Sequence, residues 1–114
     1  MAFIAIVTSD LFLAAKVQAL LLREGLASAR VGPDRLASLD GPAALVLDLG
    51  LGPELRQRVA AWAKGKMPVV AFGAHVDRDA LAWARGAGLA AVLTKGQLET
   101  RIGRAVLAAL KPER

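Results

Sequence analysis

The chain has 114 residues, enough for one compact domain and too few for two ordinary ones. Hydrophobic residues make up 55% of it and charged residues 22%, a balance typical of a folded globular protein rather than a disordered one. There is no cysteine and only one histidine, which excludes disulfides, thiolate metal sites and zinc clusters.

The net charge of +5 is concentrated in the second half of the chain. Through Asp48 there are four basic and five acidic residues, whereas the remainder has eleven basic and five acidic. A positive face is what phosphate contacts with nucleic acid require. The arginines and lysines are spread over separate segments with no aromatic stacking platform, so we favour a solvated basic surface over a nucleic-acid interface.

The first predicted unit is a strand followed by a helix. Residues 3–7 form a short apolar run typical of a buried strand, and residues 8–10 (Thr-Ser-Asp) supply helix-capping side chains. Apolar residues then recur at helical spacing from Leu11 to about Glu24, and Gly25 ends the helix.

The same alternation continues to the end of the chain. Residues 32–42 hold at most a short helix between two Gly/Pro turns. Further strands are predicted at 26–31, 43–49, 67–75 and 88–95, and further helices at 53–64, 77–85 and 98–110. Trp62 falls on the apolar face of its helix, which favours a core position over a ligand contact.

Five apolar strands alternating with helices predict an α/β fold with helices on both faces of a parallel sheet, a three-layer α/β/α arrangement. Right-handed crossovers favour the flavodoxin-like strand order 2-1-3-4-5, in one domain covering residues 1–114. Ligands bind such sheets outside the carboxyl ends of the strands. Asp48 lies at that end of the third strand, and Thr8, Ser9, Gly73 and Lys95 end their own strands at the same rim.

Two stretches resemble the receiver domain of two-component response regulators, the CheY-like family. "LVLDLGL" is similar to the family's third strand and places Asp48 at the phosphoacceptor position. "PVVAFGAHVDRDALAWARGAGLAAVLTK" is similar to the stretch that ends in the family's phosphate-binding lysine and places Lys95 there. The resemblance covers residues 3 to about 110 and implies a signalling module rather than an enzyme.

At other positions this sequence lacks the functional residue that the family has. The acidic pair that holds Mg²⁺ corresponds to Thr8 and Ser9, which leaves Asp10 and Asp48 as weak metal ligands or none, and Asp10 is most simply a helix-start residue. Gly73 replaces the hydroxyl residue of the family's switch and Val92 its aromatic residue. Gly96 replaces the proline after the lysine. We therefore predict a degenerate receiver, or pseudo-receiver, with no required cofactor.

Two interpretations of Asp48 and Lys95, at the carboxyl end of the sheet, remain open. Asp48 and Lys95 form an inert ion pair, which we favour, or they keep a residual phosphate or metal site. The family's usual partner face would present Trp83, Arg101 and Arg104, although Trp83 fits the core equally well. The first helix carries more apolar residues than packing on a sheet requires, so some should form a partner or self-association face.

The sequence as a whole predicts a stand-alone cytoplasmic module that signals through a protein partner or a homodimer, without normal Mg²⁺-dependent aspartyl phosphorylation. One alternative is a phosphorylation-competent response regulator that takes phosphate on Asp48 from a histidine kinase. A second is a basic nucleic-acid-associated protein. No membrane association is expected, because Asp10 and Lys16 interrupt the apolar N-terminal region.

Overall fold

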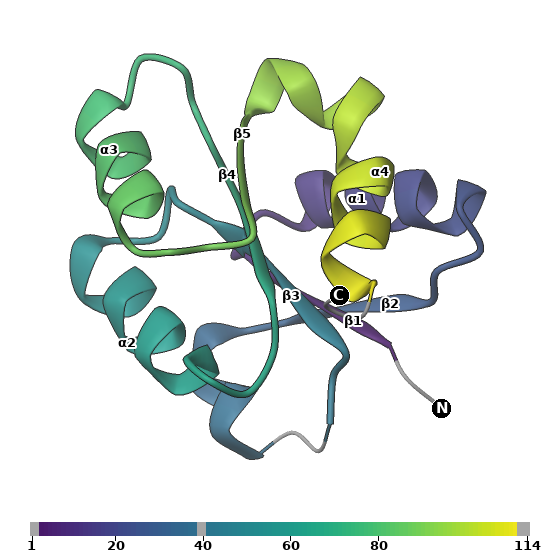
Figure 1. Ribbon diagram of the computed structural model, residues 1–114, viewed down its shortest axis with the longest axis horizontal. Helices are drawn as coiled ribbons and strands as arrows, with labels where there is room; N and C mark the ends of the chain where they lie inside the picture. The colour runs from purple at the N-terminus through teal and green to yellow at the C-terminus, as the bar shows by residue number, and fades with distance from the viewer. Residues whose placement is uncertain (1–2, 39–40, 112–114) are drawn as a thin grey trace.

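The computed structural model describes residues 3–38 and 41–111, and it contains one parallel sheet with helices on both sides (Figure 1). The strands are β1 (Ile4–Val7), β2 (Ser28–Val31), β3 (Ala44–Asp48), β4 (Val69–Gly73) and β5 (Ala91–Thr94). The α-helices are α1 (Leu11–Arg23), α2 (Pro53–Ala63), α3 (Arg78–Gly86) and α4 (Leu98–Leu110). Two short 3₁₀ helices, η1 (Pro33–Ser38) and η2 (Lys95–Gln97), complete the order.

The strands are hydrogen-bonded in the order β2-β1-β3-β4-β5, and every pair is parallel. This order confirms the predicted topology. Strands β1, β3 and β4 are buried along their whole length because they lie inside the sheet. Their continuous apolar sequences follow from being covered on both faces.

Side-chain alternation along the strands divides the core into two layers. On one face, Val7, Leu45, Leu47 and Ala71 pack with buried residues of α2 and α3. On the other face, the intervening strand residues pack against α1 and α4. Figure 1 shows these two helix pairs on opposite sides of the sheet.

Local signals in the sequence explain where the helices begin and end. The Asp10 side chain caps α1 by accepting the Leu13 N–H, and Asp77 does the same for α3 through the Ala80 N–H. Pro53 occupies the first turn of α2, where its missing N–H costs no hydrogen bond. After α1 the chain turns at Gly25 with φ of 76°, a conformation that favours glycine.

The predicted elements are present, with shorter strands than the apolar runs suggested. The apolar runs at 26–31 and 88–95 contain strands of only four residues each, because residues 26–27 and 88–90 lie in the connections before β2 and β5, and Lys95 already belongs to η2. Trp62, on α2, is half-buried and packs against the core layer as predicted, with the Lys66 ammonium 4.4 Å from its ring centre. Within the described ranges, no helix has both the length and the hydrophobicity needed to cross a bilayer.

The packing predicts that Leu47→Ala lowers the free energy of unfolding by about 2–5 kcal/mol, because Leu47 is fully buried in β3 and its truncation leaves a cavity. The matched control is Val76→Ala, since Val76 is 73% exposed and should cost less than about 0.5 kcal/mol. Urea titrations followed by circular dichroism measure both. Equal losses in the two variants would contradict this description of the core.

Candidate functional site

The strand register brings Thr8 and Asp48 together at the carboxyl end of the sheet. Val7 pairs with Leu47, so the next residues, Thr8 and Asp48, stand side by side at the ends of β1 and β3. Both belong to the set of strand positions that faces α1 and α4, since their neighbours two residues earlier lie in that core layer. These two side chains are the buried polar residues of the described chain.

Both carboxylate oxygens of Asp48 have hydrogen-bond donors from the protein itself. The Thr8 hydroxyl donates to Asp48 Oδ2 at 2.6 Å, and the backbone N–H of Gly50 donates to Oδ1 at 2.7 Å. Asp48 is only 6% exposed and Thr8 is fully buried. A buried carboxylate needs such donors because it has lost its contacts with water.

The Thr8 hydroxyl is also fully engaged. Its oxygen accepts the Asp10 N–H at 3.1 Å while its proton is donated to Asp48. The Asp10 carboxylate lies at the start of α1, where Oδ1 accepts the Leu13 N–H at 3.0 Å. The network therefore runs from Gly50 through Asp48 and Thr8 to the first turn of α1.

This donor set does not fit a tightly held magnesium ion. Mg²⁺ requires hard oxygen ligands, usually at least one or two carboxylates directed at a common point. Asp48 accepts two internal donors, Asp10 caps its helix, and a neutral hydroxyl lies between them. Among residues 3–38 and 41–111, no three histidine, cysteine, aspartate or glutamate residues group as metal ligands.

The predicted ion pair between Asp48 and Lys95 is absent. In the described part of the chain, the one ion pair within 4.0 Å joins Lys16 to Glu99, at 3.4 Å. Lys95 is exposed at the start of η2. It follows β5, two strands from β3, and Leu93 is the β5 residue level with Asp48. To reach Asp48, the Lys95 side chain would have to cross two strands and come back two residue positions along them. In this structure it extends into solvent instead.

A side chain at position 73 would crowd Leu49, which would have to shift by a few tenths of an ångström. A Cβ built on Gly73 would lie 3.2 Å from Leu49 Cβ and 3.3 Å from Leu49 Cδ1, with Leu81 Cδ2 at 3.6 Å. Val92 on β5 is half-buried and packs against the core layer of α2 and α3. Ser9 and Gly96 are exposed at the same end of the sheet.

Two arginines near the carboxyl end of the sheet belong to no motif found in the sequence. Arg30, on β2, donates to the Thr8 carbonyl at 2.9 Å. Arg56, on α2, donates to the Leu49 carbonyl at 3.4 Å, and its guanidinium lies 5.4 Å from the centre of the Trp83 ring. Both guanidiniums therefore brace the backbone beside Thr8 and Asp48. A polar strand residue and a helix arginine give no sequence signal for such contacts.

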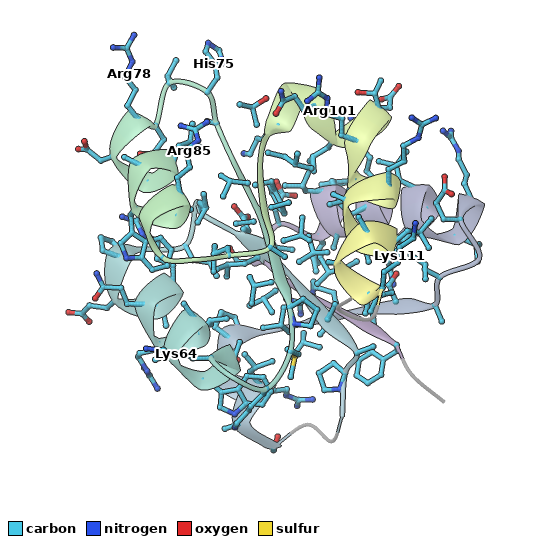
Figure 2. All side chains as sticks on the ribbon, viewed as in Figure 1. Lys64, His75, Arg78, Arg85, Arg101 and Lys111 are labelled. Atoms are coloured by element: carbon cyan, nitrogen blue, oxygen red, sulfur yellow. The ribbon has the colours of Figure 1, made fainter. Side chains whose placement is uncertain are left out.

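Trp83 does not lie on the same surface as Arg101 and Arg104, contrary to the predicted partner face. It is half-buried in the core layer of α2 and α3, beneath Arg56. Arg101 and Arg104 are exposed on α4 and line a shallow hollow with Leu93 of β5. In Figure 2, Arg85 on α3 and Arg101 on α4 lie on opposite sides of β5. The face around β5 is therefore basic, with Trp83 turned toward α2.

Solved structures show which fold this is. A signal receiver domain of a two-component response regulator from Bacteroides fragilis matches with a TM-score of 0.84 and 20% identity, covering 99% of both chains. A response regulator receiver protein from Burkholderia phymatum matches with a TM-score of 0.83 and 24% identity, covering 96% of this chain and 95% of the other. The chain has the receiver fold.

The receiver fold extends to very distant sequences. A signal receiver domain described with a histidine kinase from Clostridium thermocellum shares 11% identity, yet its TM-score is 0.80 over 97% of this chain and 98% of its own. No protein-family model and no curated protein matches the sequence. At these identities the likeness establishes the fold alone, so the chemistry of the site must be argued from its own residues.

Thr8→Val should lower the free energy of unfolding by about 1–3 kcal/mol, because it leaves Asp48 Oδ2 buried without a donor. Thr8→Ser keeps the hydroxyl and is the control. In a double-mutant cycle, Asp48→Asn should reduce the cost of Thr8→Val. Strictly additive effects in urea titrations would show that the two side chains do not interact.

Gly73→Ser should destabilise the protein by about 1–3 kcal/mol, because the new Cβ would crowd Leu49 and force it to shift. Combining it with Leu49→Ala should cost less than the sum of the two single changes, since the smaller residue vacates that space. Thermal unfolding of the three variants measures this coupling. A Gly73→Ser protein as stable as the wild type would contradict the packing described here.

Proposed function

We propose that this chain is a pseudo-receiver, a signalling module that acts through protein contacts without Mg²⁺-dependent phosphorylation of Asp48. The observation that carries the proposal is the pair of hydrogen bonds on that carboxylate, from Thr8 and from the Gly50 backbone. A histidine kinase is then not required as a phosphate donor. The cytoplasm would be the site of action, in keeping with two-component signalling.

The first support comes from the state of the nucleophile. A carboxylate that attacks a phosphoryl group must present a free oxygen toward the incoming phosphorus. At 6% exposure, Asp48 is largely shielded from an incoming phosphorus, and each of its oxygens is oriented by a hydrogen bond within the protein. A phosphorus atom approaching Oδ2 would compete with the bond from Thr8, whose own oxygen accepts the Asp10 N–H.

The second support comes from electrostatics. Phosphoryl transfer depends on neutralising the charge of the transferred group, which metal ions and fixed cations supply. The metal ligands are incomplete, and the Lys95 ammonium is not paired with Asp48. Gly73 offers no hydroxyl to bind a phosphoryl oxygen. In the described residues, therefore, no group of metal ligands, no hydroxyl at position 73 and no lysine paired with Asp48 is in place to stabilise the transition state.

The contact surface we assign to this function is the basic face around β5. Arg101 and Arg104 border its hollow, whose remaining lining is Leu93, Thr100 and Ala105. An apolar floor with cationic edges suits a protein partner better than a nucleic acid, because no aromatic side chain is available there for base stacking. Trp62 and Trp83 both lie on the opposite core layer.

The proposal predicts that wild-type protein forms no acyl phosphate with acetyl phosphate and does not respond to Mg²⁺ with beryllofluoride. Intact-mass spectrometry measures the first, and tryptophan fluorescence of a Trp62→Phe variant measures the second through Trp83. Trp83 is a suitable reporter because Arg56 links it to the backbone at Leu49.

The matched variant is Thr8→Asp/Ser9→Asp, which restores the acidic pair beside Asp48. Mg²⁺ should raise its melting temperature and leave that of the wild type unchanged. Phosphorylation of the wild type that is lost in Asp48→Asn would establish a competent receiver and refute the proposal. Salt-sensitive binding of DNA or RNA that is lost on neutralising Arg101 and Arg104 would instead assign the basic face to nucleic acid.

A further inference from the structure

Helix α1 is apolar on two sides, although only one side contacts the sheet. Its inner face, with Ala14, Val17, Leu20 and Leu21, is buried against the strands. A second set of apolar residues faces solvent on the other side of the helix. We call this set the outer stripe, and its members are Leu11, Phe12, Ala15, Ala19 and Leu22.

The outer stripe is strongly exposed at both of its ends. Phe12 is 91% exposed, Leu22 is 69% exposed and Leu11 is 64% exposed. At 100° per residue, the five members fall within an arc of about 100°, as wide as the apolar face of a helix that packs on a core. Such an arc is typical of a surface that another molecule covers.

The polar side chains of α1 are held at the edges of this stripe. Lys16 forms the ion pair with Glu99 of α4, and the Gln18 amide donates to the Ser28 carbonyl of β2 at 3.3 Å. Each therefore contacts a neighbouring element of the same domain. No charged side chain interrupts the outer stripe itself, so burying it would require no desolvation of an ion.

We propose that the outer stripe binds the outer stripe of a second copy of this chain, with the two α1 helices antiparallel. The proposal concerns a different face from Asp48 and stands whether or not Asp48 is phosphorylated. It makes the protein a symmetric dimer, in which each copy presents its basic β5 face independently.

The spacing of the outer stripe is self-complementary under a two-fold axis that is perpendicular to α1 and crosses it at the level of residue 17. That axis places Phe12 of one copy against Leu22 of the other, and Ala15 against Ala19. The large residues then meet at the two ends, and the alanines in the middle allow the helix axes to approach closely. Identical patches that match themselves in this way are the signature of a two-fold interface.

The charges at the helix ends support the antiparallel orientation. It brings Arg23 at the end of one helix beside Leu11 of the other, one residue from the exposed Asp10. Glu24 does not oppose this approach, because its side chain lies over Gly103 of α4. The two helix dipoles are also opposed in this arrangement, which is favourable.

The area available indicates a weak dimer. A fully buried aromatic side chain covers about 150–250 Å², so Phe12, Leu11, Leu22 and the alanines supply roughly 1,000 Å² over the two copies. This lies near the lower limit of about 1,000–1,200 Å² for specific interfaces, which predicts dissociation at micromolar concentrations. A bilayer surface is the less suitable occupant, because Arg23 is the one cation of α1 that no described ion pair engages.

The test is sedimentation velocity of the wild-type chain from about one micromolar to a few hundred micromolar, a range that brackets a micromolar constant. We expect a monomer–dimer equilibrium, weakened at least tenfold by Phe12→Glu. Val76→Glu is the matched control, since it charges an apolar residue outside α1 that is also strongly exposed, at 73%, and should leave the equilibrium unchanged. Circular dichroism confirms that both variants are folded.

Cysteine cross-linking tests the orientation, since the natural chain has no cysteine. A mixture of Phe12→Cys and Leu22→Cys proteins should form the mixed disulfide, whereas neither protein alone should cross-link efficiently. In the antiparallel dimer, identical positions lie about 15 Å apart along the axis, at 1.5 Å per residue. Cross-linking of each variant with itself would indicate parallel helices and overturn the proposed arrangement.

A wild type that stays monomeric throughout the concentration range would refute the dimer. An equal weakening by Phe12→Glu and Val76→Glu would place the contact elsewhere. Monomeric protein that floats with anionic phospholipid vesicles, and loses this binding in Phe12→Glu, would assign the outer stripe to a membrane surface instead.

Discussion

The hydrogen bond between the Thr8 hydroxyl and the Asp48 carboxylate, 2.6 Å long, joins the ends of β1 and β3, two adjacent inner strands of the sheet. Parallel strands leave their last side chains at one rim, where a polar group must find either water or an internal partner. Here the partner is internal. The carboxylate is thus held by Thr8 and Gly50 rather than by the Lys95 ammonium, which forms no ion pair with it.

The surroundings of this bond reinforce it from three directions. The Gly50 N–H holds the second oxygen of Asp48, and the Asp10 N–H holds Thr8 from the first turn of α1. Arg30 and Arg56 bind the carbonyls of Thr8 and Leu49, so the backbone on both sides is tied to β2 and α2. Thr8 and both oxygens of Asp48 are thus held by partners within the protein, which favours one conformation at this end of the sheet.

The sequence predicted the fold well because the fold depends on patterns that extend over many residues. Continuous apolar runs indicated buried parallel strands, and capping residues such as Asp10 and Gly25 marked the limits of the first helix. These signals reflect burial and local backbone geometry, which neighbouring residues determine together. The strand order then followed from the handedness of the crossovers.

The site was predicted less well because its contacts depend on single side chains. The register placed Asp48 and Lys95 on one rim, but whether a lysine extends across two strands or into solvent is not encoded in strand patterns. The sequence comparison treated Thr8 only as a replacement for an acidic metal ligand. A hydroxyl beside a buried carboxylate, however, is itself a hydrogen-bond donor. The close approach of Leu49 to Gly73 could not be predicted either, because the two residues are far apart in sequence and are brought together by the pairing of β3 with β4.

Leu49 also bears on which residues position 73 can accept. Because the Leu49 side chain lies next to Gly73, a larger residue at position 73 would require Leu49 to shift by a few tenths of an ångström. A smaller residue at position 49 would remove that requirement, so the effects of changes at these two positions should depend on each other. The pair is therefore a place where the two halves of the sheet constrain each other's amino-acid choice.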